Sequence, residues 1–449
     1  MNRICIAVAS ATALFFSLVP SAQGQELKTG YFLDYNIYGS SINPALQPER
    51  TRFFLGAAVG DIGLRANSSV GVSSLFFPFD GELVTGLNEN ISAATFLGGL
   101  PSMTKLNADL SENILGFGFR GQTDGVFTTV KLNVKSNNGV TVPKSVFECL
   151  KEEGESDLYN MSGISFFSRN YAELAVSQSR KISDLITVGV SLKGLMGLAD
   201  AHLDVDRMSI DNRGDDTVVE GAGCIRASVP YVQFHEDEYG NIDLDDVISD
   251  DEFHFKPAGF GLAADLGVVV TPFEGLSVSA GLTDLGFIAW KRNMSGTMGS
   301  NTFESSDEVA DDIMELFHFK YEQSGGSYLS MLNAQANVGV RYRLPFAHCL
   351  SVGALYSTRI GSTAARYNDF RAGLTFTPGR MLSIAGSAGI SSCGLSTGAA
   401  MNLKLGPLNV FAGVDGIFTQ LTAQYLPVNP ISTVAKLGLS MVIGSKKGE

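Results

Sequence analysis

Two short motifs in this sequence resemble motifs that carry a nucleophilic serine in enzymes. Residues 394–398 read Gly-Leu-Ser-Thr-Gly and match the nucleophile elbow Gly-x-Ser-x-Gly, while residues 102–105 match Ser-x-x-Lys. The elbow requires a helix after the serine, and Ser-x-x-Lys is informative only with companion motifs that this chain lacks. Strand-like segments on both sides of residues 394–398 favour a glycine-rich turn. We therefore predict that the chain has no catalytic residue and that the protein is not an enzyme. The alternative is an outer-membrane enzyme whose catalytic side chains are scattered along the sequence and meet only in the fold.

Metal-binding residue types are present, but their spacing matches no known site. Carboxylates gather in residues 231–252, and residues 237–243 combine them with a glycine without the register of an EF-hand. This pattern favours a solvated acidic loop over a calcium site. The histidines stand alone, without a His-x-x-x-His pair or a cysteine at ligand spacing, so we predict no metal and no cofactor. They are His202, His235, His254, His318 and His348.

The formal net charge of −14 argues against nucleic acid as a partner, because nucleic-acid binding needs basic patches. The cysteines that follow residue 24 are too far apart to match a metal motif. In an oxidising compartment they can form disulfides, and free thiols are equally compatible with the sequence. These cysteines are Cys149, Cys224, Cys349 and Cys393.

The first 24 residues have the order of a secretory signal peptide. Arg3 is positive, residues 4–19 are almost wholly apolar, and residues 22–25 read Ala-Gln-Gly-Gln, with a small-x-small site. We expect cleavage after Gly24. Cys5 precedes the apolar stretch and no cysteine lies at the cleavage site, which argues against a lipoprotein. The sequence therefore predicts export from the cytoplasm.

The composition of the remaining chain favours one large closed sheet. The sequence contains 50 Gly, 29 Phe and 13 Tyr but only 17% charged residues, and its mean hydropathy is +0.14. No stretch of about 20 apolar residues follows residue 24, so no helix is expected to span a membrane. Because only helices and closed barrels satisfy every backbone group in lipid, the chain is either a β-barrel or a soluble β-rich protein.

Apolar and polar residues alternate with period two in many segments. In residues 276–283 leucine, valine and alanine alternate with serine, glycine and threonine, and residues 334–343 follow the same rule. Such strands present different chemistry on their two faces. In a membrane barrel the apolar face meets lipid and the polar face lines the lumen. The pattern is less regular in residues 130–135, 172–177, 186–192, 372–377 and 435–440.

Turn lengths favour the barrel over a soluble sandwich, because short periplasmic turns and long outer loops are typical of transmembrane barrels. Here short connections alternate with long polar segments. The short connections are near residues 181–184, 274–275, 344–348, 378–379 and 406–407, and the long segments near 197–255, 293–327 and 419–432.

We therefore predict an all-β fold: a closed antiparallel transmembrane β-barrel of about 14 strands (roughly 12–16), since an even number leaves both termini in the periplasm. Residues 1–24 are the signal peptide, 25–61 an N-terminal hatch and 62–449 the barrel, with long outer loops. Residues 205–227 form an extra hairpin in one outer loop, and residues 305–320 a short loop helix. The strands are predicted near residues 62–76, 110–120, 126–137, 163–179, 185–196, 257–272, 276–291, 328–343, 349–359, 366–377, 380–392, 396–405, 408–417 and 434–444.

A short Asn-Pro-Ala motif, Asn43-Pro44-Ala45, precedes the predicted barrel, and its proline keeps the segment out of regular ladders. On these residues the chain resembles the fatty-acid-transporter-like outer-membrane β-barrel family, whose members commonly carry this motif soon after the signal peptide. It resembles most closely a Bacteroidota group of such proteins. The similar stretches are residues 41–50, 105–120, 171–200 and 276–290. The chain departs from many barrels at residues 444–449, which do not end on an aromatic residue.

The resemblance implies a passive channel or transporter for hydrophobic or amphipathic small molecules in the outer membrane of a Gram-negative bacterium. It places Asn43, Pro44 and Ala45 in a hatch inside the barrel, along the transport pathway. The expected partners are outer-membrane lipid and a hydrophobic small-molecule ligand. Some relatives serve a secretion machinery without holding a substrate, so the alternative is a surface barrel that binds a secretion or envelope partner. A purely structural role for the Asn-Pro-Ala turn also stays open.

Overall fold

The computed structural model describes most of the chain after residue 25, and every structural statement below refers to the residues it describes. These are 26–48, 51–57, 62–121, 125–152, 156–213, 217–230, 232–249, 256–299, 301–303, 319–322, 325–361, 367–392, 394–417, 422–423, 428, 430 and 432–444.

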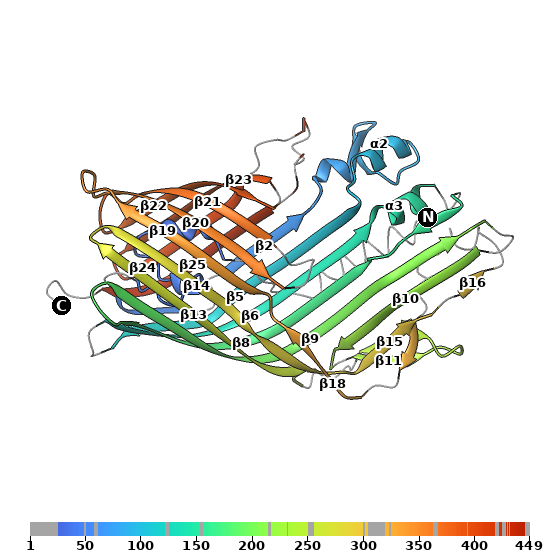
Figure 1. Cartoon of the computed structure of the whole chain (residues 1–449), viewed down its shortest axis with the longest axis horizontal. Coiled ribbons are helices and arrows are strands. Elements are labelled where there is room, and N and C mark those ends of the chain that lie inside the picture. The colour runs from blue at the N-terminus through green and yellow to red at the C-terminus, as the bar shows by residue number, and fades with distance from the viewer. Residues whose placement is uncertain are drawn as a thin grey trace.

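The strands of the wall form a closed antiparallel barrel of 14 strands, which confirms the predicted fold (Figure 1). The first wall strand has two pieces, β1 (Thr51–Ala57) and β2 (Ile62–Ser68), and both pair with the last strand, β25 (Ser432–Gly444). This pairing closes the barrel, and every other wall strand pairs with the next one along the chain. The other wall strands are β5 (Met103–Arg120), β6 (Val126–Pro143), β8 (Ser165–Lys181), β9 (Ile186–Asp211), β13 (Gly259–Phe273), β14 (Leu276–Lys291), β19 (Ala334–Arg343), β20 (Leu350–Ile360), β21 (Tyr367–Phe376), β22 (Leu382–Ser391), β23 (Gly394–Leu405) and β24 (Leu408–Ile417).

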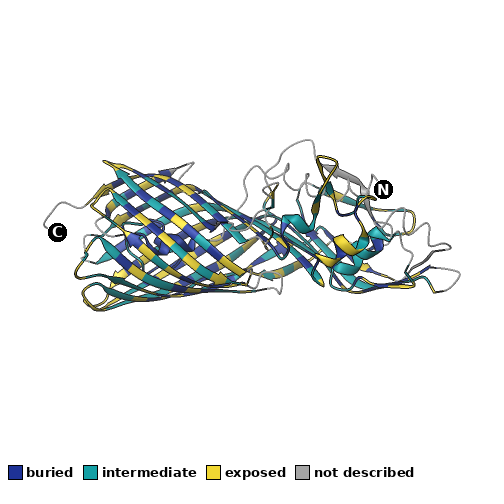
Figure 2. Cartoon of the chain, turned by 90° about the horizontal axis from the view of Figure 1, so that it is seen from above, coloured by how far each residue is buried: buried dark blue, intermediate teal, exposed yellow. Residues whose placement is uncertain are grey.

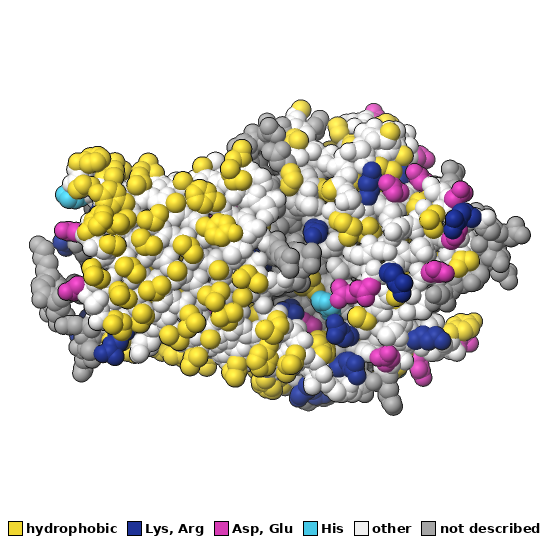
Figure 3. All heavy atoms as spheres, in the orientation of Figure 1, with side chains coloured by type: hydrophobic (Ala, Val, Ile, Leu, Met, Phe, Trp, Pro, Cys, Tyr) yellow, Lys and Arg dark blue, Asp and Glu magenta, His cyan; other side chains and the backbone are white. Residues whose placement is uncertain are grey.

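Strand β9 shows how the alternating pattern builds the wall. Val190 and Leu192 are 45% and 66% exposed on the outside, whereas Ser191 and Lys193 between and beside them are 1% and 7% exposed. Hydrophobic side chains consequently gather over the barrel wall, while most charged side chains gather beyond it (Figure 3). A closed barrel with an apolar outside and a polar inside is the form in which strands cross the outer membrane. None of the helices in the described part of the chain is long and apolar enough to cross a membrane.

Several wall strands continue beyond the barrel into an outer extension (Figures 1 and 2). There β9 pairs with β10 (Thr217–Ser228), which confirms the predicted hairpin at residues 205–227. The smaller elements outside the wall are β3 (Phe76–Phe79), β4 (Glu82–Thr85), α2 (Ala93–Gly98), α3 (Lys144–Lys151), β7 (Leu158–Asn160), β11 (Val232–Glu236), β12 (Ile242–Ser249), β15 (Met294–Met298), β16 (Asn301–Phe303), β17 (Phe319–Glu322) and β18 (Ser327–Met331), with the short 3-10 turn η3 (Val72–Ser74).

Residues 26–48, called the N-terminal segment below, lie inside the barrel (Figure 1). The segment contains two short 3-10 helices, η1 (Lys28–Phe32) and η2 (Gly39–Ser41), and most of its side chains are buried. The wall begins at Thr51, so the predicted barrel start at residue 62 was too late. The reason is closure: without β1, the facing backbone groups of β5 and β25 would lack hydrogen-bond partners.

Two motifs that suggested chemistry have structural roles. The carboxylate of Asp237 accepts hydrogen bonds from the backbone N–H groups of Tyr239 and Asn241, at 2.9 and 2.7 Å, and so stabilises the turn between β11 and β12. Ser396 lies within β23, after the β22–β23 turn, and its hydroxyl accepts a hydrogen bond from Arg371 Nη2 at 2.9 Å. Neither arrangement is that of a calcium loop or of a nucleophile elbow.

The predicted loop helix at residues 305–320 lies outside the described residues except at its end. There Phe319 and Lys320 begin β17, which pairs with β15 and extends the outer sheet. These two residues are therefore in a strand and not in the predicted helix. Cys149, Cys224 and Cys349 are free thiols. Cys393 lies outside the described residues.

Candidate functional site

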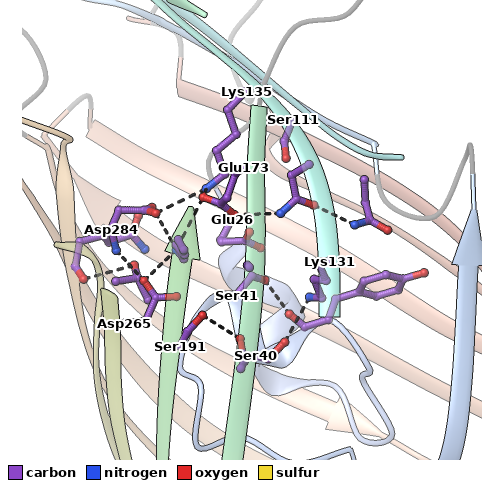
Figure 4. Close-up of a pocket in the computed structure, with 18 of the residues that line it drawn as sticks. Glu26, Ser40, Ser41, Ser111, Lys131, Lys135, Glu173, Ser191, Asp265 and Asp284 are labelled. Atoms are coloured by element: carbon purple, nitrogen blue, oxygen red, sulfur yellow. Dashed lines mark hydrogen bonds and ion pairs between the residues drawn. The ribbon is translucent and has the colours of Figure 1, made fainter. Parts of the chain in front are cut away.

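A polar cavity of about 100 Å³ lies inside the barrel between the N-terminal segment and the wall (Figure 4). Its wall side is formed mainly by β5, β6, β8 and β9, and its other side includes Glu26, Ser40 and Ser41. Amide, hydroxyl and charged side chains dominate the lining, Asn113 and Asn133 among them. The polar inner faces of these strands therefore line a space that can hold a small molecule.

Five charged side chains, each from a different neighbouring strand, line this cavity and form what we call the charged cluster: Lys135, Glu173, Lys193, Asp265 and Asp284. Figure 4 labels Lys135, Glu173, Asp265 and Asp284. Lys193 Nζ lies 2.7 Å from both Asp265 Oδ1 and Asp284 Oδ1. Lys135 Nζ lies 2.9 Å from Glu173 Oε2 and 3.4 Å from Asp284 Oδ1. Burying any one of these charges alone would be costly, and the mutual pairing offsets the lost hydration. No group of His, Cys, Asp or Glu in the described part of the chain is arranged to hold a metal ion.

A β-bulge places both aspartates against Lys193. The register between β13 and β14 shifts between Ala264 and Leu266, and Asp284 has a φ of +59°, in the left-handed region that side chains other than glycine rarely adopt. The carboxylate of Asp265 accepts a hydrogen bond from the Asp284 N–H at 2.8 Å and so supports this conformation. A strained backbone at a charged luminal position marks this cluster as a candidate functional site.

An apolar layer borders the cavity. Tyr171 and Leu332 line it and belong to a buried cluster that also contains Leu195 and Trp290. The Trp290 indole donates a hydrogen bond to Ser330 Oγ at 2.7 Å, which satisfies its one polar group inside this layer. The site therefore combines a charged and amide-rich part with an aromatic part, and this suits an amphipathic molecule.

The predicted residues Asn43, Pro44 and Ala45 lie together against β13 and β14, not in the cavity. The Asn43 amide donates hydrogen bonds to the carbonyl oxygens of Val268 and Ala280, at 3.2 and 3.0 Å. Its own Oδ1 accepts a hydrogen bond from the Ala45 N–H at 2.8 Å. These contacts fasten the N-terminal segment to the wall. The sequence predicted that the Asn-Pro-Ala motif lies in a hatch along the transport pathway; in the structure the motif contacts the wall, and its place on a pathway stays a prediction.

A second anchor lies at η1. The backbone N–H groups of Lys28 and Thr29 donate to Asp415 Oδ2, at 2.8 and 3.2 Å. The Lys28 amine lies 3.8 Å from Asp369 Oδ2 and 4.3 Å from the centre of the Tyr367 ring. Lys28 as a residue is only 3% exposed. These contacts hold the start of the segment against β21 and β24.

Burial lowers the pKa of Lys28 from 10.5 to about 7, and the charge of Asp369 opposes this shift while Arg65 and Arg371 add to it. Between about pH 7 and 10.5 the buried amine is neutral, whereas in an unfolded chain it still binds a proton. Stability should therefore rise over this range, on the order of a few kcal/mol, and be flat below it. We expect the thermal midpoint of the barrel in detergent to show this rise.

The matched variant for this test is Lys28→Met, which keeps the side-chain length without the amine. The thermal midpoint of this variant should not rise between pH 7 and 10.5, and below pH 7 it should equal or exceed the thermal midpoint of the wild type. An unchanged pH profile in the variant would contradict the assignment to Lys28.

Sequence reasoning missed the charged cluster, although a signal for it is present. Lys193 lies between Leu192 and Gly194, and Glu173 between Ala172 and Leu174, inside strands of membrane-spanning length. Ionisable residues at such depth are expensive and usually mark pathways or pairs. Single strands, however, do not reveal which of these residues meet.

The chain was compared with protein-family models, curated proteins and solved structures. The model of the family described as "Family of unknown function (DUF5723)" matches residues 44–415. No curated protein sequence matches the chain. The Ralstonia pickettii toluene transporter TbuX is similar at 11% identity and a TM-score of 0.47, with 95% of this chain and 100% of that chain covered. The P. putida toluene transporter TodX is similar at 8% identity and a TM-score of 0.44, with 95% of this chain and 97% of that chain covered. A Pseudomonas aeruginosa FadL homologue is similar at 10% identity and a TM-score of 0.42, with 94% of this chain and 98% of that chain covered.

Proposed function

Because the chain belongs to the DUF5723 family, whose function is unknown, we propose a function from the lumen itself: a passive outer-membrane channel for small hydrophobic or amphipathic molecules. The observation that carries this proposal is the cavity, in which polar groups such as Asn133 and the charged cluster face Tyr171 and Leu332. A molecule with a polar head and an apolar body satisfies both parts of this lining. Two of the similar structures named above are toluene transporters, and toluene is a cargo of this class.

In this proposal the N-terminal segment is the hatch. Asn43, Pro44 and Ala45 fix its position, and the charged cluster sets the polarity of the path beside it. The proposed pathway residues from the Asn-Pro-Ala motif are thus positioning residues for the hatch.

The test is uptake by vesicles whose outer leaflet contains lipopolysaccharide, a leaflet that slows unaided crossing of apolar molecules. Purified protein should raise the initial uptake of radiolabelled octanoate and toluene at least tenfold over protein-free vesicles, because the lumen offers a path that avoids this leaflet. Sucrose, which has no apolar part, serves as the comparison solute. Equal rates for octanoate with and without protein would overturn the proposal.

A second candidate is a surface barrel that binds a secretion or envelope partner. The observation that favours it is the outer extension, where charged side chains gather beyond the apolar wall (Figure 3). Absence of uptake together with a stable partner in pull-downs from outer membranes would favour this function over the channel.

A further inference from the structure

We infer that the solute passes beside the N-terminal segment, along the inner face of β6 and β8, while the segment itself stays in place. This inference rests on the proposed channel function and specifies its route. It follows from three observations: where the segment is anchored, where the lumen is hollow, and which groups line the hollow part.

Most of the contacts that anchor the segment lie away from β6 and β8; on β6, the Lys131 amine donates a hydrogen bond to Ser40 Oγ at 3.1 Å. Its first helix, η1, contacts β20, β21, β22, β23 and β24. Arg341 on β19 pairs with Asp34, and Thr375 Oγ1 on β21 donates to the carbonyl oxygen of Phe32 at 2.6 Å. The Asn337 amide donates to the Ile42 carbonyl oxygen at 2.9 Å. Release of the whole segment would break all these contacts together.

Glycines of the wall let the segment lie very close to it. A Cβ atom at Gly281 would lie 2.9 Å from Asn43 Cβ, and one at Gly353 would lie 3.1 Å from the Phe32 ring. Packing this close leaves no path for a solute between the N-terminal segment and the wall at β14 and β20. The anchored side of the segment is therefore sealed.

The hollow part of the lumen lies on the opposite side. Below the polar cavity is a narrow void of about 10 Å³, which we call the slot, and the two share Ile37, Ser40 and Ser177 as lining residues. The slot continues along Phe127 and Ser179. These two residues are close to the short connections at the ends of β6 and β8, which are the periplasmic ends. Cavity and slot thus follow the same two strands towards the periplasm.

The slot has two kinds of lining. Phe127 and Pro48 offer apolar surface, whereas Thr129, Ser177 and Ser179 offer hydroxyl groups. A narrow amphipathic molecule can pass edge-on, with its apolar side against the phenylalanine and its polar side against the hydroxyls. The slot is the narrowest part, so it sets the size limit of the cargo.

The slot is lined by Ile37, Ser40 and Pro44 from the middle of the segment and by Leu46 and Pro48 from its end. In this inference the end shifts to widen the slot, while the middle stays in place. Gln47 Nε2 donates to the Gly125 carbonyl oxygen at 2.7 Å, and Arg120 donates to Gln47 Oε1 and to the Pro48 carbonyl oxygen, each at 3.2 Å. These contacts lie at the periplasmic mouth of β5 and β6. A small movement of residues 46–48 would open the path without moving η1 or Asn43.

A disulfide lock tests whether the segment stays in place. Thr29 Oγ1 and Ser387 Oγ lie 2.5 Å apart, so cysteines at both positions can join the segment to β22. In the vesicle assay, the oxidised Thr29→Cys/Ser387→Cys protein should take up octanoate within about twofold of its own reduced form. Wild type treated with the same oxidant controls for the native cysteines. Loss of uptake on oxidation, restored by reduction, would overturn the inference.

A second pair of variants tests the route. Thr129→Trp fills the slot and should lower octanoate uptake at least tenfold, whereas Thr128→Trp, one residue away on the other face of β6, should not. Equal uptake by both variants would overturn the route while leaving the channel function intact. If the wild type itself takes up no octanoate, the channel function fails and the route fails with it.

Discussion

Replacing Gly267 with alanine is expected to loosen the N-terminal segment and make the barrel leak. Gly267 pairs with Gly189 on one side and Gly281 on the other, so three glycines form one row beneath the Asn-Pro-Ala motif. A Cβ atom at Gly267 would overlap Asn43 Oδ1 and lie 2.9 Å from Pro44 Cδ. The ring of a proline cannot rotate away, so the segment must shift.

The expected cost of this overpacking is about 1–3 kcal/mol. A displaced segment also loses the two hydrogen bonds from Asn43 to the wall. We therefore expect a lower thermal midpoint in detergent and faster efflux of the large polar dye calcein from vesicles.

The matched control is Gly194→Ala on the outer face of β9. A Cβ atom there would have nothing within 4 Å, so neither stability nor calcein efflux should change. If both substitutions behave alike, the close fit between the glycine row and the motif does not hold the segment.

Replacing Lys193 with methionine is expected to destabilise the barrel by about 3–5 kcal/mol, because it leaves buried carboxylates without their cation. Lys193 is the closest cation to Asp265, with the two charged groups 2.7 Å apart. Lys135 reaches only Glu173 and Asp284. The unfolding free energy from urea titration in detergent measures the loss.

Adding Asp265→Asn should recover part of the loss, since it removes the carboxylate that lost its partner. The matched surface variant is Lys181→Met, which breaks the exposed Lys181–Asp184 pair, with the lysine side chain 48% exposed, and should cost at most about 1 kcal/mol. An equal loss from both single variants, or no recovery in the double variant, would contradict the role assigned to the charged cluster.

The wall could be predicted from sequence because its pattern is local. In residues 276–283 the side chains point alternately to lipid and to the lumen, so an odd or even position in the strand decides the direction. The same rule located most of the other wall strands, whereas the outer hairpin was predicted from the requirement for an even number of strands. It misplaced the start of the wall, because β1 has no clear alternation of its own and is defined by its partners β5 and β25.

The N-terminal anchor was only partly visible. Asn43-Pro44-Ala45 stands out as a motif, but the glycines that receive it are spread over β9, β13 and β14. A glycine in an alternating strand looks like any other small luminal residue. Its role appears only once the segment lies against it.

The sequence by itself determined that this protein is a chain of alternating strands that closes into a barrel, since the choice between lipid and lumen is made residue by residue. Only the tertiary structure decided that Lys135, Glu173 and Lys193 share one cavity with Asp265 and Asp284. That meeting depends on the register between five strands and on a bulge at Asp284. Register and bulges are set by pairing across the whole sheet, so no single strand carries them.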